Sequence, residues 1–400
     1  MDTAYVQLRS VPHHRFIAAS KEFVIVTKRT GLAAAGVVAL IAAGSAACGT
    51  AQATPQAKVQ SAFTKLGDQK AVTLGLSFDA TADQIYAVMQ GDDFTRQDAE
   101  LLSKLRATLS VSTQKQIGLL TSGSNATDAT KDGAAGFTLS ADKSGNSNLI
   151  DLRAVNQKLY LRADIKGLEK LDTSPNASSD LREFNQFLNQ ADQLPSSLNA
   201  VKAGLKGQWV EIDPKAWLDF GKSMAKQMGG SGSSSSPFDA LTGPKIDPKT
   251  EAKLFDAIKQ AFVHNATFKD LGNSNGADHV QVTVPARQLA KELSTSLPPI
   301  LKQFPGVKAS DLKGLSDTSG VPNRTISFDV ALKGKDISAL TVDLAQFDDK
   351  ATGNKLPLTL TIDHNTDALT APSDAQQLNP QDLVGLFMAN ANPSGSSFSS

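Results

Sequence analysis

Hydrophobic and polar residues alternate in two long blocks of the chain. Such alternation predicts β-strands in which every second side chain faces the core. Between two of these runs, Asn156-Gln157 predicts a hairpin turn, and Gly334-Lys335-Asp336 predicts another in the second block. The alternating apolar positions are Val72, Leu74, Leu76 and Phe78; Leu109 and Val111; Phe137 and Leu139; Ile150, Leu152 and Ala154; Val280, Val282 and Val284; Ile326, Phe328, Val330 and Leu332; Leu340, Val342 and Leu344; and Leu356, Leu358, Leu360 and Ile362.

Apolar residues at helical spacing predict helices around these blocks. Pro55 opens one whose apolar stripe is Val59, Ala62, Phe63 and Leu66. Further helices are expected near residues 80–105, where Thr95 and Asp98 have the spacing of a capping box, at Ser178–Leu194, after Asp213-Pro214, after Asp247-Pro248, and at Arg287–Leu297 up to Pro298-Pro299.

A helix followed by a strand block occurs twice, at residues 55–66 and again at 250–262. We predict a single domain over residues 57–388 that contains a flexible loop at 229–246, within which Gly229–Ser236 reads GGSGSSSS. Two lobes, 57–228 and 247–388, remain the alternative. Residues 389–400 are predicted to form a disordered tail.

The segment before Cys48 has the pattern of an export signal. Lys28 and Arg29 precede an uncharged run from Gly31 to Ala47, and Cys48 follows at once as the only cysteine of the chain. A positive start, an apolar stretch and small residues at the cleavage point mark a signal peptide. Ser45-Ala46-Ala47-Cys48 resembles a bacterial lipobox, in which the thiol receives a diacylglyceryl group, although Ser45 stands where an aliphatic residue is usual.

We therefore expect residues 1–47 to be a signal peptide, Cys48 to be lipidated, and residues 48–56 to tether the protein to the extracytoplasmic face of the cell membrane. The stretch from Val26 to Cys48 is a complete signal by itself, so the true start is expected at Val26. Two alternatives stay open. The run is an uncleaved membrane helix, although it is short and weakly apolar, or Cys48 is an ordinary residue beside the signal.

Charge and cysteine content exclude some kinds of partner and site. The chain has 40 basic and 40 acidic residues; five of the basic and two of the acidic ones precede Cys48, so the remainder is mildly acidic. A mildly acidic protein lacks the excess of basic residues with which nucleic-acid-binding proteins contact phosphates. Without a second cysteine, disulfides and thiolate metal sites are excluded.

No catalytic constellation is found among the polar residues. His264, His279 and His364 lie far apart after Cys48, and no GxSxG motif is present. Asp348-Asp349 has the setting of a solvated turn, and GGSGSSSS lacks the lysine of a phosphate loop. We predict a protein without enzymatic activity, cofactor or metal.

The apolar residues are mostly Leu, Val, Ala and Ile, with only 6% aromatic residues in the chain. Such an interior is compatible with a cavity for flexible acyl chains. Periodicity alone favours a solid core, because alternating strands predict a filled interior equally well.

The order of elements resembles the LppX/LprG family of actinobacterial cell-envelope lipoproteins, which are similar in fold to the periplasmic carrier LolA. The resemblance rests on the lipobox cysteine, the early helix and strand, and the hairpin around Asn156-Gln157, over most of residues 55–375. It continues in Gln208-Trp209-Val210-Glu211-Ile212, in Asp278–Pro285 with its helix, and in a meander ending at Leu356–Ile362.

This resemblance implies an α+β fold, with one large curved antiparallel sheet shaped as a half-barrel and helices packed on its concave face. It also implies an apolar pocket between sheet and helices that takes lipid or glycolipid acyl chains. The pocket wall would be formed by Val72, Leu74, Leu76, Phe78, Ile150, Leu152, Val280, Val282, Ile326, Phe328 and Val330. The chain is longer than the usual family member, with the surplus near 80–105 and 178–245.

Three functional hypotheses follow. The first is a lipid or glycolipid carrier, and the second is a structural or interaction lipoprotein with a filled core and a protein partner. The third, an enzyme of unfamiliar design, requires Asp, Glu and His side chains to converge in one cleft. For the carrier we expect a monomer.

Overall fold

The computed structural model describes residues 54–91, 94–114, 133–171, 196–227, 248–304, 323–348, 353–364 and 366–382, with residues 182, 307, 312, 318, 321 and 351. Residues 1–47, Cys48, most of the predicted helix Ser178–Leu194, the loop 229–246 and the tail 389–400 lie outside the described residues.

Twelve strands of the described part of the chain form one sheet. The strands are β1 (Ala71–Phe78), β2 (Arg106–Thr113), β3 (Gly133–Ser140), β4 (Asn148–Val155), β5 (Lys158–Ala163), β6 (Val210–Ile212), β7 (Thr267–Ser274), β8 (Ala277–Pro285), β9 (Thr325–Lys333), β10 (Asp336–Asp343), β11 (Pro357–Asp363) and β12 (Gln376–Gln377).

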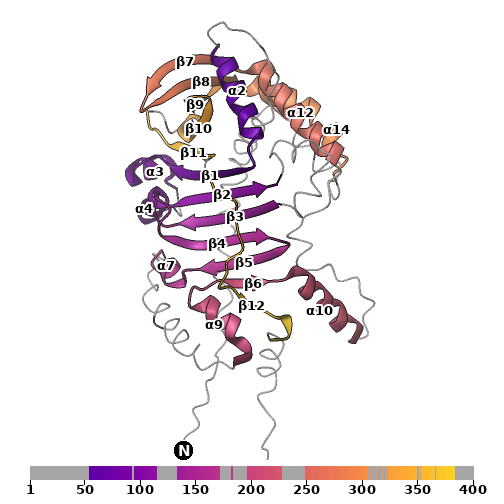
Figure 1. The fold of residues 1–400 in the computed structure, drawn as a ribbon. Coiled ribbons are helices and arrows are strands. Elements are labelled where there is room, and N and C mark those ends of the chain that lie inside the picture. Colours follow the sequence, from indigo (N-terminus) through magenta and orange to yellow (C-terminus); the bar gives the residue numbers. More distant parts are fainter. Residues whose placement is uncertain are drawn as a thin grey trace, which may run out of the picture.

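The helices flank this sheet (Figure 1). They are α2 (Pro55–Gly67), α3 (Ala82–Met89), α4 (Arg96–Lys104), α7 (Ile165–Glu169), α9 (Asn199–Leu205), α10 (Pro214–Gln227), α12 (Pro248–Asn265), α13 (Ala286–Ser296) and α14 (Pro298–Leu301), with short 3₁₀ turns η3 (Ser196–Leu198) and η4 (Leu344–Phe347).

The strands are ordered β12-β6-β5-β4-β3-β2-β1-β11-β10-β9-β8-β7. All neighbours are antiparallel except the short parallel pair of β12 with β6. The two alternating blocks meet where β1 pairs with β11, so both belong to the same sheet. The predicted α+β class and the large, curved, mostly antiparallel sheet are confirmed.

Several local predictions hold because short-range chemistry decides them. Asn156 and Gln157 both have positive φ, at 52° and 63°, as a two-residue hairpin turn requires. Thr95 and Asp98 form the predicted capping box of α4. The Asp213 carboxylate accepts hydrogen bonds from the backbone amides of Lys215 and Ala216 at the start of α10.

Two local predictions differ from the structure. Pro298-Pro299 ends α13 as expected but also starts the new helix α14, because proline is tolerated in a first helical turn. Leu344 leaves the strand pattern for η4, whose first turn is capped by the Asp343 carboxylate.

The main core lies where α2 packs against the sheet. The α2 stripe Val59, Ala62, Phe63 and Leu66 is almost fully buried. Val72 of β1 and Val280 of β8 belong to the same buried cluster, although β11, β10 and β9 lie between their strands. Both can contact one helix only if the sheet curves around it, so α2 occupies the concave side. Phe262 of α12 reaches the same cluster and lies against Phe328, with ring centres 6.1 Å apart.

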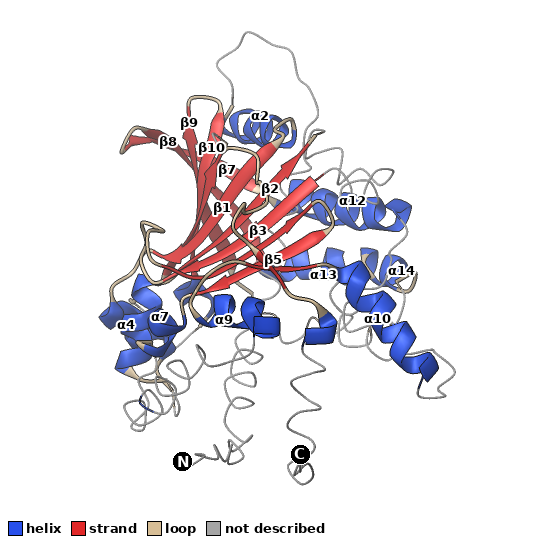
Figure 2. Cartoon of the chain, turned by 60° about the horizontal axis from the view of Figure 1, so that its bottom comes forward, coloured by secondary structure: helices blue, strands red, loops and turns tan. Residues whose placement is uncertain are grey.

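A second, smaller core lies at one end of the central strands. Ile85 of α3 and Ala99 of α4 are completely buried there, together with Leu356 before β11. On the other side, α12, α13 and α14 stand together beside the curved sheet (Figure 2). None of the helices in the described ranges is both long enough and apolar enough to span a bilayer.

Candidate functional site

The apolar positions of neighbouring strands lie opposite one another and form one continuous face of the sheet. Leu74 is paired with Leu109, Leu109 with Phe137, Phe137 with Leu152, and Leu152 with Leu161. Side chains directly opposite in a sheet point to the same side. This face continues that of Val72 and Leu74 in β1, and therefore belongs to the concave side that holds α2.

The part of this face that runs from β1 to β5 is partly exposed. Five large side chains are exposed there: Leu76 by 41%, Leu109 by 45%, Phe137 by 36%, Leu152 by 44% and Leu161 by 37%. We call these five residues the apolar band. It crosses four inter-strand spacings of about 4.8 Å, roughly 19 Å in all. Contiguous exposed apolar surface of this kind marks a binding site in soluble proteins.

The opposite face of the same strands is buried although it is polar. Ser112 in β2, Ser140 in β3 and Asp151 in β4 are exposed by only 6%, 1% and 4%. Tyr160 in β5 is likewise buried. In β2 to β5 the face opposite the apolar positions is therefore the more buried one, and it combines these polar residues with the apolar Leu149 and Val155.

A segment near the C-terminal end covers part of this face. Residues 366–378, which we call the strap, cross the convex face of the sheet and end in β12 (Figure 1, yellow). The backbone amide of Leu369 donates to Ser112 Oγ at 3.0 Å, and Arg153 donates to the carbonyl oxygen of Thr370 at 3.2 Å. Ala371 and Ala375 of the strap pack against a small cluster of Val155, Tyr160 and Trp209.

The buried polar groups beneath the strap have partners. Asp151 accepts hydrogen bonds from Arg162 Nε at 3.0 Å and from Thr138 Oγ1 at 2.8 Å. The guanidinium groups of Arg153 and Arg162 lie 4.7 and 4.9 Å from the ring centre of Trp209. Cation–π contacts and a paired buried carboxylate stabilise a polar layer that would otherwise be costly to cover.

The eleven residues predicted to line a pocket all lie on the concave face but fall into three groups. Val72, Val280, Val282 and Val330 are buried in the cluster beneath α2 and α12. Leu74, Phe78, Ile150, Ile326 and Phe328 are half-buried, whereas Leu76 and Leu152 are exposed. The structure thus places the eleven on one face and divides them between a filled part and an open part.

Sequence reasoning left out Leu109, Phe137 and Leu161, which complete the band. The available signal for Leu109 and Phe137 was their alternation with polar residues, whereas Leu161 follows the hairpin turn predicted at Asn156-Gln157. What alternation does not reveal is the strand order, and only the order β5-β4-β3-β2-β1 places these side chains in one row.

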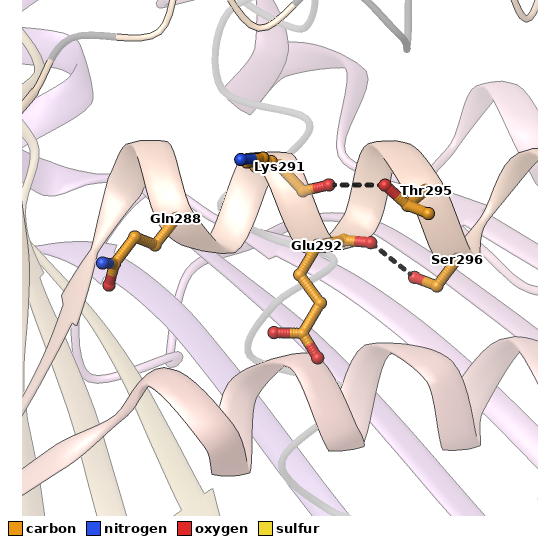
Figure 3. Close-up of a pocket in the computed structure, with 5 residues that line it drawn as sticks. All are labelled: Gln288, Lys291, Glu292, Thr295 and Ser296. Atoms are coloured by element: carbon orange, nitrogen blue, oxygen red, sulfur yellow. Dashed lines mark hydrogen bonds between the residues drawn. The ribbon is translucent and has the colours of Figure 1, made fainter.

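A separate shallow depression of about 430 Å³ runs along α13. Its lining is Gln288, Lys291, Glu292, Thr295 and Ser296, and Glu292 points toward the neighbouring helix (Figure 3). The Glu292 carboxylate is hydrogen-bonded to His264 Nδ1 at 3.0 Å and accepts from Asn265 Nδ2 at 2.6 Å, so it joins α13 to α12. Thr295 and Ser296 donate to backbone carbonyls of their own helix. These contacts occupy most of the polar groups of the depression.

The three histidines are dispersed in the sheet and on α12. His279 contacts Asp329 across β8 and β9 at 2.5 Å, whereas His364 donates from Nε2 to the carbonyl oxygen of Ile337. Among the residues that the structure describes, no three His, Cys, Asp or Glu side chains gather into a metal-binding group.

No protein-family model and no curated sequence matches the chain.

Proposed function

We propose that this protein is a membrane-anchored envelope lipoprotein that binds the acyl chains of lipids or glycolipids on its apolar band. The observation that carries the proposal is the row of five large apolar side chains, each exposed by 36–45%, on the concave side of the sheet. The same side is packed against α2 and α12 at the other end of the sheet, whereas the band remains partly exposed.

The energetics favour an apolar ligand. Leaving large apolar side chains in water forgoes roughly 25 cal/mol for each Å² that could be buried. An acyl chain laid on the band recovers this energy and contributes about 0.8 kcal/mol for each methylene that leaves water. The band has no charged side chain that would have to be desolvated.

The shape of the surface distinguishes acyl chains from a protein partner. The band lies inside the curve of the sheet, where a slender flexible chain fits more readily than a flat protein surface. A protein partner is the second candidate, because an exposed apolar patch is also the mark of a docking surface. A projecting helix or loop of that partner would have to enter the curve.

The proposal includes attachment through a lipid on Cys48, which follows from the lipobox-like segment. A large curved antiparallel sheet with a helix on its concave side supports the resemblance to carriers of the LolA type. In this proposal the protein binds and displays or transfers its ligand, and it carries out no chemistry on it. No cofactor or metal takes part.

A photoreactive fatty acid with a diazirine on its chain tests the proposal. Irradiation of the Cys48→Ser protein should place adducts on peptides that contain Leu109, Phe137, Leu152 and Leu161, and excess unlabelled fatty acid should abolish them. Leu271 on β7 is 50% exposed and serves as an internal control for adducts on any exposed apolar residue. Equal labelling of Leu271 and the band, or labelling that does not compete, would refute a specific acyl site.

A further inference from the structure

The strap crosses the same strands that carry the apolar band, on their other side. Leu369 is hydrogen-bonded to β2 and Thr370 to β4, whereas Leu109 and Leu152 project from these strands into the concave side. The strap therefore lies on the convex face of these strands, and the proposed ligand would lie on their concave face.

Gly136 of β3 provides a seat for the strap. A Cβ atom at this position would lie 3.3 Å from Leu369 Cδ1 and 3.4 Å from Leu369 Cδ2. Glycine thus lets the Leu369 side chain lie directly against the backbone of β3. On the opposite side of the same strand, Phe137 belongs to the band.

The end of the strap forms β12, the edge strand beside β6. The amide of Gln376 donates to the Trp209 carbonyl at 2.9 Å and that of Leu378 donates to the Glu211 carbonyl at 2.8 Å. Trp217 Nε1 of α10 donates to the Leu378 carbonyl at 3.3 Å. Because β6 has only three residues, these bonds are a large share of what holds it, and β6 in turn pairs with Leu161 of the band through Val210.

Much of the strap faces solvent. Asp367, Ala368, Thr370, Ser373, Asp374, Gln376 and Gln377 are exposed. Segments with few buried apolar contacts and solvent-exposed hydrogen bonds open locally at low free-energy cost. The part of the sheet beneath α2, in contrast, is fixed by a helix with a fully buried stripe.

We propose that the strap is a clasp that regulates ligand retention on the apolar band. When docked, it holds β2 to β6 in the paired, curved form that presents the band as one row. When released, it frees β6 and loosens β5, and the acyl chain dissociates. This inference rests on the proposed function. By thermodynamic reciprocity, a bound acyl chain should in turn strengthen docking of the strap.

A reversible lock tests the clasp in the full chain with Cys48→Ser, which has no other cysteine. The Leu369 amide lies 3.0 Å from Ser112 Oγ, so Ser112→Cys and Leu369→Cys are the pair chosen for cross-linking, and the intact mass under oxidising conditions verifies that the disulfide forms. Dissociation of cis-parinaric acid, a naturally fluorescent fatty acid, is then measured for the oxidised and the reduced form of this double variant. We expect the oxidised form to release it at least about fivefold more slowly, the lower end of usual coupling between sites.

The Cys48→Ser parent with and without reductant is the control and should not change. Gly136→Val supplies the opposite perturbation, since its side chain displaces Leu369; release should be faster, and hydrogen exchange at the Gln376 and Leu378 amides should rise. Equal release from the oxidised and reduced forms, in a protein whose binding is abolished by Leu152→Asp, would overturn the clasp alone. Absence of binding by the Cys48→Ser parent, or binding insensitive to Leu152→Asp, would overturn the proposed function and the clasp with it.

Discussion

Phe137 and Leu152 face each other directly across β3 and β4, and 36% and 44% of their surfaces remain exposed. An aromatic–aliphatic pair of this kind normally forms the centre of a core. Here it forms the centre of a partly exposed surface, and the strap lies on the other side of the same strands.

Replacing Leu152 by Asp should weaken binding of a fatty acid by at least about tenfold, since a carboxylate against an acyl chain must be desolvated without a partner. The free energy of unfolding should fall by only about 1–2 kcal/mol, because 44% of the side chain is already exposed. Fluorescence titration and urea denaturation measure the two quantities. Leu271→Asp, at a 50% exposed site outside the band, is the matched control and should bind normally.

Truncation of two phenylalanines on the concave side should lower the stability of the protein by different amounts. Phe63 of α2 is 1% exposed, so Phe63→Ala should cost about 3–5 kcal/mol of unfolding free energy. Phe137→Ala should cost less, about 2 kcal/mol, because 36% of its surface is already exposed, but it should also reduce ligand binding. A loss of stability as large as that of Phe63→Ala would show that the band is part of the packed core.

Much of the fold could be predicted from short-range patterns. The α2 stripe, the hairpin turn at Asn156-Gln157 and the capping box of Thr95 are all determined by residues within one turn or one strand. These features depend on local dihedral preferences and on the period of the apolar residues.

The site could be predicted only in part, because it depends on relationships between distant segments. Alternation indicated that Leu76 and Val280 each belong to the apolar side of their own strand, but not that only Val280 would be covered by a helix. Nor did it indicate that residues 366–378 would cover part of the opposite side of β2 to β5. The alternation within a strand predicts which of its sides is apolar. Whether a helix or another segment then covers that side depends on packing between segments that are distant in the sequence.

Removing the Asp151 carboxylate should destabilise the strap side of the sheet. Asp151 is 4% exposed and pairs with Arg162, whose side chain is 37% exposed. Loss of one partner of a fully buried pair costs about 3–5 kcal/mol, and partial screening of Arg162 lowers the expectation for Asp151→Ala to about 2–3 kcal/mol. Thermal or urea unfolding measures this cost. An unchanged midpoint would mean that the buried carboxylate makes no net contribution.

Asp142 should make stability depend on acid pH. Hydrogen bonds from Ser144 and Ser147 hold the pKa of its carboxyl well below its usual range, and the backbone amide of Ser147 donates to it at 2.7 Å. A depressed pKa in the folded state stabilises the protein above the unfolded pKa of about 3.9, and this contribution is lost as pH falls below it. Asp142→Asn should therefore be less stable than the wild type at pH 7, and the difference should shrink below about pH 4. A difference that is independent of pH would contradict this assignment.

Native mass spectrometry of the Cys48→Ser protein, purified from a bacterial envelope without detergent exchange, tests the central claim most directly. We expect a population whose mass exceeds that of the chain by one lipid, identified by extraction, and its loss in a Leu109→Asp/Leu152→Asp double variant that remains folded. A lipid-free mass for the unaltered band, or the same lipid retained by the double variant, would contradict the claim that the apolar band is an acyl-chain binding site.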